Sequence, residues 1–343
     1  MSTFADSTRP LRLGVWASDG DNVHFLDPIL QRLPDRYEVH TFSWSVTAPA
    51  EEKARQLAAE LQTVDIAWFE WATGPVLRGS QWTKDLPTVC RLHRYEAYGA
   101  APRHIRWENV DRLIFIAKGV EETFQRLHKQ ILPALRVTEV IPNGIAVDEY
   151  PLKQDKERGY NLGFLARLNI IKNPMMLIQL MARLVKEDPR YTLHIAGAVR
   201  EYVVMQYLEY HVNQCGLSKH FRFHGALNPA QVKQWLAKQH YILSTSVIEG
   251  HPVGVMEAMS VGLKPIIHDY VGARDIFPDA FLFNTIDEAV AMILSEDYEP
   301  VRYRQFIEEN YTVDRQVEAV TRVLDELVQV YYPERRLKTG RAA

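Results

Sequence analysis

The chain has 343 residues, of which 47% are hydrophobic and 24% charged, the ordinary balance of a globular protein, and its length predicts about two domains. A formal net charge of −3 excludes a global field that draws the chain to nucleic acid. Two distant cysteines, Cys90 and Cys215, exclude a disulfide framework. No signal peptide or long apolar span is found, so we expect a cytoplasmic protein. Peripheral contact with the inner membrane face stays open.

In the first half, short β-rich runs alternate with longer helical patterns. Such alternation is typical of a parallel sheet with crossover helices. A polar loop containing Gly20 follows the first predicted strand. The predicted strands are 11–16, 37–42, 65–69, 87–92 and 112–116, and the predicted helical segments are 23–30 and 51–61.

The turn sequence Ile141-Pro-Asn-Gly-Ile-Ala-Val-Asp148 interrupts this alternation, which then restarts. The sequence therefore predicts an α/β fold with domains 1–150 and 151–312 and a closing helix with a basic tail at 313–343. Ligands of two such doubly wound sheets bind where the carboxyl ends of the strands face a central cleft. The second half has predicted strands at 161–165, 191–195, 221–224, 241–246 and 263–268, and helices at 174–186, 202–215, 229–238, 253–261 and 313–332.

Two glutamates, Glu249 and Glu257, flank a predicted strand-to-helix corner, VIEGHPVGVMEAMSVG. Glycine lets backbone N–H groups approach a ligand, and a helix start is suited to phosphate. Carboxylates bind hydroxyls, so the layout suits a nucleotide sugar, with sugar hydroxyls at Glu249, diphosphate at the loop and ribose at Glu257. Taken alone, the spacing also fits two solvated glutamates beside a helix. The loop residues expected at the donor are Gly250, His251, Pro252, Val253 and Gly254.

This corner closely resembles the EGxPxxxxEAMAxG signature of retaining glycosyltransferases of the GT-B fold, family 4 (glycosyl transferases group 1). Three more segments match in the family's order. Residues 141–148 resemble its IPNGID turn, 163–174 its GRLxxxKG motif and 270–276 its GGxxEI loop. The resemblance covers about residues 140 to 280. It implies two Rossmann-like domains facing a central cleft, an N-terminal one for the acceptor and a C-terminal one for the donor.

By this resemblance, Arg167 and Lys172 contact the donor diphosphate. Two cations there offset the charge that develops on a leaving nucleotide diphosphate. The alternative is a solvated Arg and Lys at a helix start, which the helix dipole disfavours unless an anion is near. The chain departs from the family's pattern at Gly272-Ala273, at Asp275, at Arg274 and at His251, which is either a pocket-lining ring or a surface residue. These departures leave the donor's identity open.

In the N-terminal half, Gly20 corresponds to the family's phosphate loop, although two aspartates flank it. His93 follows a predicted strand where the family often carries a histidine near the reacting sugar. It orients a hydroxyl or takes a proton, or else makes a structural hydrogen bond, with Glu96 nearby. From 91 to 136 there are nine Lys or Arg against five acids. This segment fits a phosphorylated or lipid-linked acceptor, an anionic membrane surface, or a solvated mixed-charge face.

The sequence thus predicts a retaining transfer of a sugar from a nucleotide-diphosphate sugar to a hydroxyl acceptor, which is a glycan, lipid-linked or a small molecule. No cofactor and no metal are expected, because dinucleotide, P-loop, zinc and D-x-D patterns are missing. The alternatives are another nucleotide-sugar enzyme of this fold, an epimerase or a phosphorylase, and a catalytically silent binding subunit. The residues expected to take part in catalysis are Glu249, His93, Arg167 and Lys172.

Overall fold

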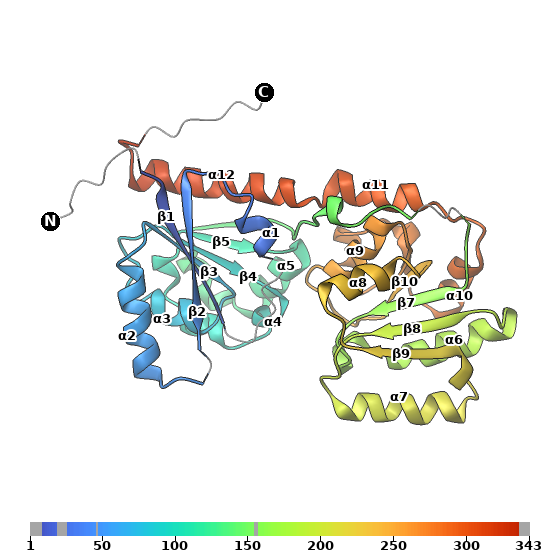
Figure 1. The fold of residues 1–343 in the computed structure, drawn as a ribbon. Coiled ribbons are helices and arrows are strands. Elements are labelled where there is room, and N and C mark those ends of the chain that lie inside the picture. The colour runs from blue at the N-terminus through green and yellow to red at the C-terminus, as the bar shows by residue number, and fades with distance from the viewer. Residues whose placement is uncertain (1–8, 19–25, 46, 154–156, 336–343) are drawn as a thin grey trace. The chain divides into compact units, whose positions relative to one another are not determined.

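The computed structural model describes residues 9–18, 26–45, 47–153 and 157–335, and the chain forms two compact units (Figure 1). The first unit comprises residues up to Pro142 together with those from Val313 onward, and the second comprises Asn143–Thr312. The sequence predicted a boundary near 150 and a separate closing segment. Within the described residues, no helix is long and apolar enough to cross a membrane.

The first unit contains a six-stranded parallel sheet in the order β2-β1-β3-β4-β5-β6. The order reverses between β1 and β3, so the connections that leave these two strands run in opposite directions. The strands are β1 (Leu11–Ser18), β2 (Tyr37–Trp44), β3 (Ile66–Glu70), β4 (Thr88–Leu92), β5 (Arg112–Phe115) and β6 (Val137–Val140). The helices are α1 (Asp27–Leu30), α2 (Ala50–Leu61), α3 (Gly74–Gly79), α4 (Arg94–Ala97), α5 (Lys118–Leu127) and α12 (Val313–Tyr331).

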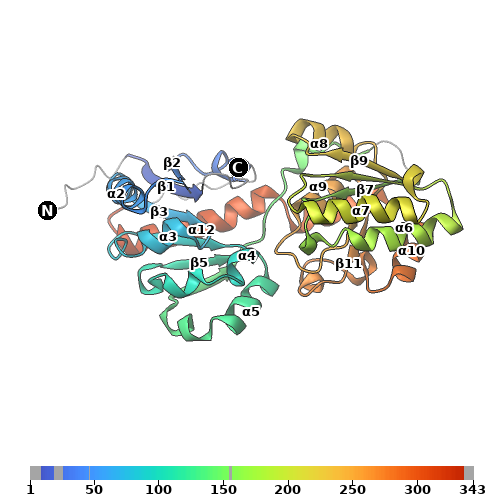
Figure 2. The same cartoon turned by 90° about the horizontal axis from the view of Figure 1, so that it is seen from below.

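Helix α12 belongs to the first unit because its apolar stripe is buried there. It lies alongside the strands of that unit (Figure 2). Polar contacts tie it to the residues just before β2 and β5: Asp325 accepts from Arg36 at 2.7 Å, and Tyr331 donates to Asp111 at 2.9 Å. The predicted amphipathic helix is therefore confirmed. Its buried apolar residues are Val313, Val317, Val320, Val323, Leu324, Leu327 and Val328.

The second unit contains another six-stranded parallel sheet, in the order β12-β11-β10-β7-β8-β9. Here the order reverses between β7 and β10, which are direct neighbours. The strands are β7 (Asn161–Leu165), β8 (Thr192–Ala196), β9 (Phe221–Gly225), β10 (Tyr241–Ser244), β11 (Lys264–His268) and β12 (Leu282–Phe283). The helices are α6 (Met175–Glu187), α7 (Tyr202–Gln214), α8 (Pro229–Leu236), α9 (Val253–Val261), α10 (Ile286–Leu294) and α11 (Pro300–Asn310).

Helices cover both faces of this sheet (Figure 1). On one face, α6, α7 and α10 share a core with β7 and β8 that includes Phe164, Leu177 and Leu193. On the other face, α9 packs beside α11. Helix α9 is apolar nearly all round, as expected for a helix buried between a sheet and a second helix. It ends at Gly262, whose φ of 96° lies in the left-handed region that favours glycine.

The predicted α/β class and the two parallel sheets are confirmed. The spans of β7 and α9 agree with the prediction residue for residue. The helical segment predicted at 23–30 is α1 only over Asp27–Leu30 in the described residues. Several elements were not predicted. Most have apolar runs too brief to show a period, although α5 buries Val120, Thr123 and Phe124 at helical spacing. The elements that were not predicted are β6, β12, α3, α4, α5, α10 and α11.

Candidate functional site

The best candidate site lies at the carboxyl ends of β7 and β10, where the strand order of the second sheet reverses. In doubly wound sheets this switch point is the place where ligands bind. The loop after β7 carries Arg167 and Lys172, and the loop after β10 carries Glu249. The fold therefore brings together two motifs that are about eighty residues apart in the chain.

The loop after β7 is held in one conformation by its own polar groups. The side chain of Asn169 accepts from the Lys172 N–H at 3.1 Å and caps the 3-10 turn Ile170–Lys172. Asn173 follows with φ of 46°, the left-handed conformation that the family's motif provides with glycine. The Thr245 hydroxyl donates to the carbonyls of Lys172 and Asn173, each at 3.0 Å. These hydrogen bonds fix the backbone of the turn that carries Lys172.

Glu249 has two partners within the second unit. The ammonium of Lys172 forms an ion pair with its Oε1, and the Ser246 hydroxyl donates to the same oxygen at 2.6 Å. Ser246 is itself fixed, because Nδ1 of His268 donates to its carbonyl at 3.0 Å. The structure therefore brings Lys172 and Glu249 into direct contact, which the sequence did not predict. Ser246 was also not predicted, and its position three residues before the glutamate was the only available signal.

The start of α9 offers backbone donors. The N–H groups of Gly250 and Gly254 make no hydrogen bond to any residue in the described part of the chain. Val253 donates to the His251 carbonyl at 2.9 Å, which tightens the entry to the helix. No side chain caps this helix. Its first turn therefore presents free donors and the positive end of the dipole, as an anion site does.

A small pocket of about 120 Å³ forms where these elements meet. Typical sites for whole ligands are roughly 300–1,000 Å³, so this pocket has room for one phosphate-sized group and not for a nucleotide sugar. It unites six of the predicted residues and adds main-chain groups at the end of β7. Its lining includes Lys172, Glu249, His251, Pro252, Val253 and Gly254, together with Leu165, Ala166, Ser244 and Ser246.

Three predicted donor residues of the second unit lie outside this lining. Gly250 is buried in the turn between Glu249 and His251. Arg167 is exposed and forms no ion pair with any described residue. Glu257, one turn into α9, accepts a hydrogen bond from the Tyr150 hydroxyl at 2.7 Å. Burial raises the pKa of Glu257, although the Tyr150 hydrogen bond opposes this shift.

The structure decides the alternative that the sequence left open for His251 and shows the surroundings of Arg274. His251 is a buried, pocket-lining ring, only 7% exposed, and it packs edge-on against Tyr311 with ring centroids 4.9 Å apart. Arg274, one of the departures from the family's pattern, is not an unpaired charge. Its guanidinium pairs with Asp269 at 2.7 Å and with Asp279 at 2.8 Å, so two carboxylates balance it.

His93 lies in the first unit, at the carboxyl end of β4. Its Nε2 is 2.5 Å from Oε1 of Glu70, which also accepts from Arg91 at 2.9 Å. Glu70 and Arg91 are completely buried. Burial alone raises the pKa of Glu70, but the charge of Arg91 and the His93 hydrogen bond outweigh it and hold this pKa below its usual value. The His93 ring thus makes a hydrogen bond to a fixed carboxylate.

Glu96, in α4, is a second buried carboxyl group of this unit. Its Oε1 accepts from the N–H of Ala72 at 3.0 Å and of His93 at 3.3 Å, in a capping box at the start of α4. Burial raises the pKa of Glu96 to about 8, and the nearby charge of Glu70 adds to this shift. Glu70 and Glu96 are therefore two neighbouring carboxyl groups, the first ionised and the second protonated at neutral pH.

The remaining predictions concern Gly20 and the basic segment 91–136. Gly20 lies outside the described residues. In the basic segment, Arg91, Arg112, Lys118 and Arg136 pair with carboxylates. Within the described ranges, the other basic residues of this segment form no ion pair. These residues are Arg94, Arg103, Arg106, Arg126 and Lys129.

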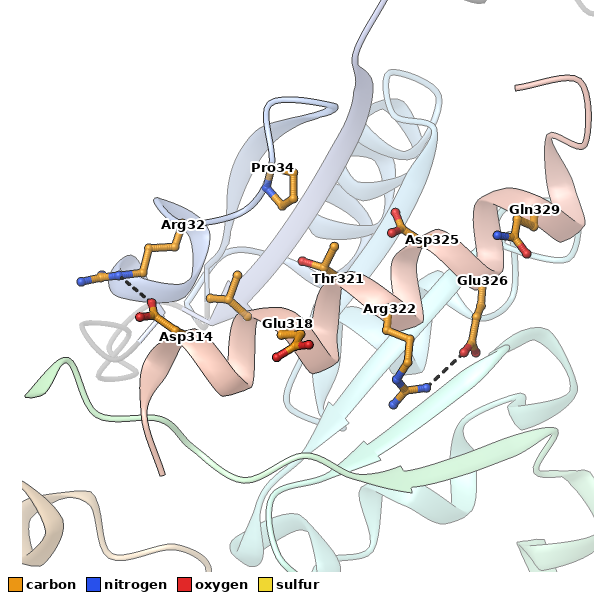
Figure 3. A pocket seen from close by; sticks show the side chains of 10 residues that line it. Arg32, Pro34, Asp314, Glu318, Thr321, Arg322, Asp325, Glu326 and Gln329 are labelled. Atoms are coloured by element: carbon orange, nitrogen blue, oxygen red, sulfur yellow. Dashed lines mark hydrogen bonds and ion pairs between the residues drawn. The ribbon is translucent and has the colours of Figure 1, made fainter. Parts of the chain in front are cut away.

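A larger and more open hollow of about 500 Å³ lies along α12 in the first unit (Figure 3). Its charged side chains largely pair with one another: Arg32 lies 3.5 Å from Asp314, and Arg322 lies 3.1 Å from Glu326. It contains none of the predicted site residues. Size alone does not make it the better candidate, because the smaller pocket combines a cation, a carboxylate and free backbone donors.

A family model described as "Glycosyl transferases group 1" matches residues 148–326, which is more than half of the chain. The chain belongs to this family. The matched segment includes the whole pocket of the second unit. Among curated proteins, the chain is similar to two GDP-mannose:cellobiosyl-diphosphopolyprenol alpha-mannosyltransferases. It is 24% identical over 191 residues to that of Xanthomonas oryzae pv. oryzae (strain PXO99A) and 27% identical over 199 residues to that of Xanthomonas campestris. Each match covers 53% of this chain and 50% of the relative, so the chain spans about half the length of these relatives.

Solved structures of other proteins share the fold of this chain. Anabaena HepE in complex with UDP and glucose superposes with a TM-score of 0.75 at 16% identity, covering 92% of this chain and 100% of that one. The apo form of the lipopolysaccharide outer core galactosyltransferase WaaB gives a TM-score of 0.70 at 16% identity, covering 92% and 99%. With its two parallel six-stranded sheets, the chain has the GT-B fold, as the resemblance implied.

Proposed function

We propose that this chain transfers a sugar from a nucleotide-diphosphate sugar to a hydroxyl acceptor, with retention at the anomeric carbon and without a metal ion. The observation that carries the proposal is the convergence of Lys172, Glu249 and the start of α9 on one pocket at the switch point of the second sheet. A cation and free helix N–H groups suit a diphosphate, and a carboxylate suits sugar hydroxyls.

In the proposed reaction, the bond between the anomeric carbon and the diphosphate oxygen breaks. The acceptor oxygen bonds to the same face of that carbon, and its proton passes to the leaving phosphate. The products are a glycoside and a nucleoside diphosphate. Lys172 and Arg167 offset the charge on the leaving group, together with the N–H groups of Gly250 and Gly254. Glu249 holds donor hydroxyls and is not a nucleophile.

The pocket accommodates only part of this donor, so the nucleoside extends beyond it. Glu257 is the proposed partner of the ribose hydroxyls. Its carboxylate is anchored on one oxygen by Tyr150, which leaves the second oxygen for a diol. Lys233 lies near this group, with its ammonium 5.3 Å from the centre of the Tyr150 ring.

We assign the acceptor to the first unit. His93 is the proposed acceptor-side group, held in orientation by Glu70, and Gly20 remains a proposed phosphate-loop residue. A lipid-linked acceptor is the first to test, because the names of the curated relatives specify a diphosphopolyprenol acceptor. The basic residues of segment 91–136 without ion pairs then suit the acceptor's phosphates or an anionic membrane surface, consistent with a cytoplasmic, peripheral enzyme.

The test begins with a thermal-shift screen against UDP-, GDP-, ADP- and CMP-linked sugars and the free nucleotides, with and without EDTA. A ligand at a hundredfold excess over its Kd adds about 2.7 kcal/mol to the free energy of unfolding. We expect one nucleotide family to stabilise the protein equally with and without EDTA. A shift that EDTA abolishes contradicts the metal-free site. No shift with any nucleotide, from a folded sample, contradicts a nucleotide-sugar donor.

The donor identified in the screen is then incubated with hydroxyl acceptors, and the products are identified by NMR. A new glycoside with the donor's anomeric configuration is the expected product. Turnover of the donor without an acceptor would indicate an epimerase, and turnover that requires inorganic phosphate would indicate a phosphorylase. Binding without any turnover would indicate a catalytically silent subunit. Glu249→Gln should keep the fold and lose most of the transfer.

A further inference from the structure

Two side chains are proposed to bind opposite parts of the donor. In the structure these two side chains form an ion pair with each other. Lys172, the proposed diphosphate partner, is paired with Glu249, the proposed partner of the sugar hydroxyls. The side chain of Glu249 is 9% exposed and that of Lys172 is 25% exposed. A pair so poorly solvated is costly to separate unless each partner finds a replacement.

The replacements differ between a nucleotide sugar and a free nucleoside diphosphate. A phosphate at the start of α9 takes Lys172 away from Glu249, and that carboxylate then needs another donor besides the Ser246 hydroxyl. The hydroxyls of a bound sugar provide this donor. A nucleoside diphosphate without a sugar takes Lys172 and leaves Glu249 short of a partner. A poorly hydrated carboxylate that loses its ion-pair partner is unfavourable.

We propose that the Lys172–Glu249 pair discriminates between donor and product: it weakens binding of the free nucleoside diphosphate more than binding of the nucleotide sugar. Ser246 is the positioning residue of this device, because its hydrogen bond keeps the Glu249 carboxylate in place when Lys172 moves to the phosphate. The device favours release of the nucleoside diphosphate after transfer. This inference rests on the proposed function of the same pocket.

The test measures affinities by isothermal titration for the wild type, Glu249→Gln, Lys172→Met and the double variant. Inorganic pyrophosphate is the first probe, because it is independent of the base. GDP, UDP and their mannose and glucose conjugates follow. In Glu249→Gln, Lys172 is released to the phosphate, so we expect pyrophosphate and the nucleoside diphosphate to bind about tenfold more tightly. The nucleotide sugar should gain nothing or lose affinity.

The double variant separates this exchange from simple repulsion. If Glu249 acts by occupying Lys172, its replacement by Gln has no effect on pyrophosphate affinity once Lys172 is Met. An equal gain in the Lys172→Met background would show that the carboxylate merely repels phosphate, and would overturn the proposal. An unchanged affinity in Glu249→Gln alone would overturn it as well.

Two further variants complete the design. Glu187→Gln is the matched control, because Glu187 pairs with Arg183 on the exposed side of α6, and it should change no affinity. Ser246→Ala should lower the affinity for the nucleotide sugar and leave that for pyrophosphate unchanged; a loss of both would refute its positioning role. If the wild type binds none of these probes, the proposed function itself fails. If it binds them without the predicted changes, only this inference fails.

Discussion

The Tyr150 hydroxyl donates a 2.7 Å hydrogen bond to Oε1 of Glu257, a residue 107 positions later in the chain. Tyr150 follows the turn that begins the second unit, and Glu257 lies in the helix of the candidate site. Glu149, next to Tyr150, pairs with Lys233 at 2.6 Å. The proposed ribose partner is therefore not a solvated glutamate, because it is supported by a hydrogen bond from a distant part of the sequence.

Replacing Tyr150 by Phe should weaken nucleotide binding. The change removes the hydrogen bond that orients Glu257 and leaves the ring packing intact. Hydrogen bonds to charged groups contribute about 1.5–3 kcal/mol, so we expect the Kd for the free nucleotide to rise about tenfold, while pyrophosphate binding stays the same. Titration calorimetry measures both. Tyr332→Phe, which removes a hydroxyl bonded to the Asp65 carbonyl, is the control. Equal loss of pyrophosphate affinity would contradict the assignment.

Replacing Arg167 by Gln should lower the affinity for diphosphate and leave stability unchanged. Arg167 is exposed and has no ion pair to lose among the described residues, and such surface changes usually alter stability by less than about 0.5 kcal/mol. A lost charged contact to phosphate should raise the Kd about tenfold or more. Arg302→Gln, at another exposed arginine of the second unit, is the control. Unchanged affinity would show that Arg167 does not reach the donor.

Replacing Glu70 by Gln should destabilise the first unit. The change leaves the fully buried Arg91 without its carboxylate partner. Removing one member of a buried pair costs roughly 3–5 kcal/mol. Urea unfolding followed by circular dichroism measures the loss. The double variant Glu70→Gln/Arg91→Met, which removes both charges, should recover part of it. A Glu70→Gln protein as stable as the wild type would contradict the structural role of this pair.

Glu96 should make the stability of the first unit fall as the pH rises. Burial raises its pKa to about 8 in the folded state, above the ordinary value of 4.5 for a glutamate. The folded state then binds more protons between these two values, so the free energy of unfolding declines from about pH 4.5 to pH 8. The slope is at most about 1.4 kcal/mol per pH unit. Glu96→Gln cannot ionise, and it should lose this decline in urea unfolding between pH 5 and 8. An identical decline in the variant would contradict the assignment.

Much of the second unit could be predicted from the sequence, because short apolar runs alternate there with helical patterns between clear turn signals. The corner around Glu249 was predicted by its glycines, its two glutamates and its likeness to a family motif. The roles of Ser246, Thr245 and Tyr150 could not be predicted in this way. Each acts through hydrogen bonds to a side chain or carbonyl whose position depends on the fold.

The sequence by itself determined the α/β class, the alternation of strands and helices and six of the residues that line the candidate pocket, because periodicity and turn chemistry are local properties. Only the tertiary structure decided which charges meet. It paired Lys172 with Glu249 and placed His93 on a buried Glu70. These contacts join different strands and loops. They arise from the order of strands in each sheet, which no local pattern specifies.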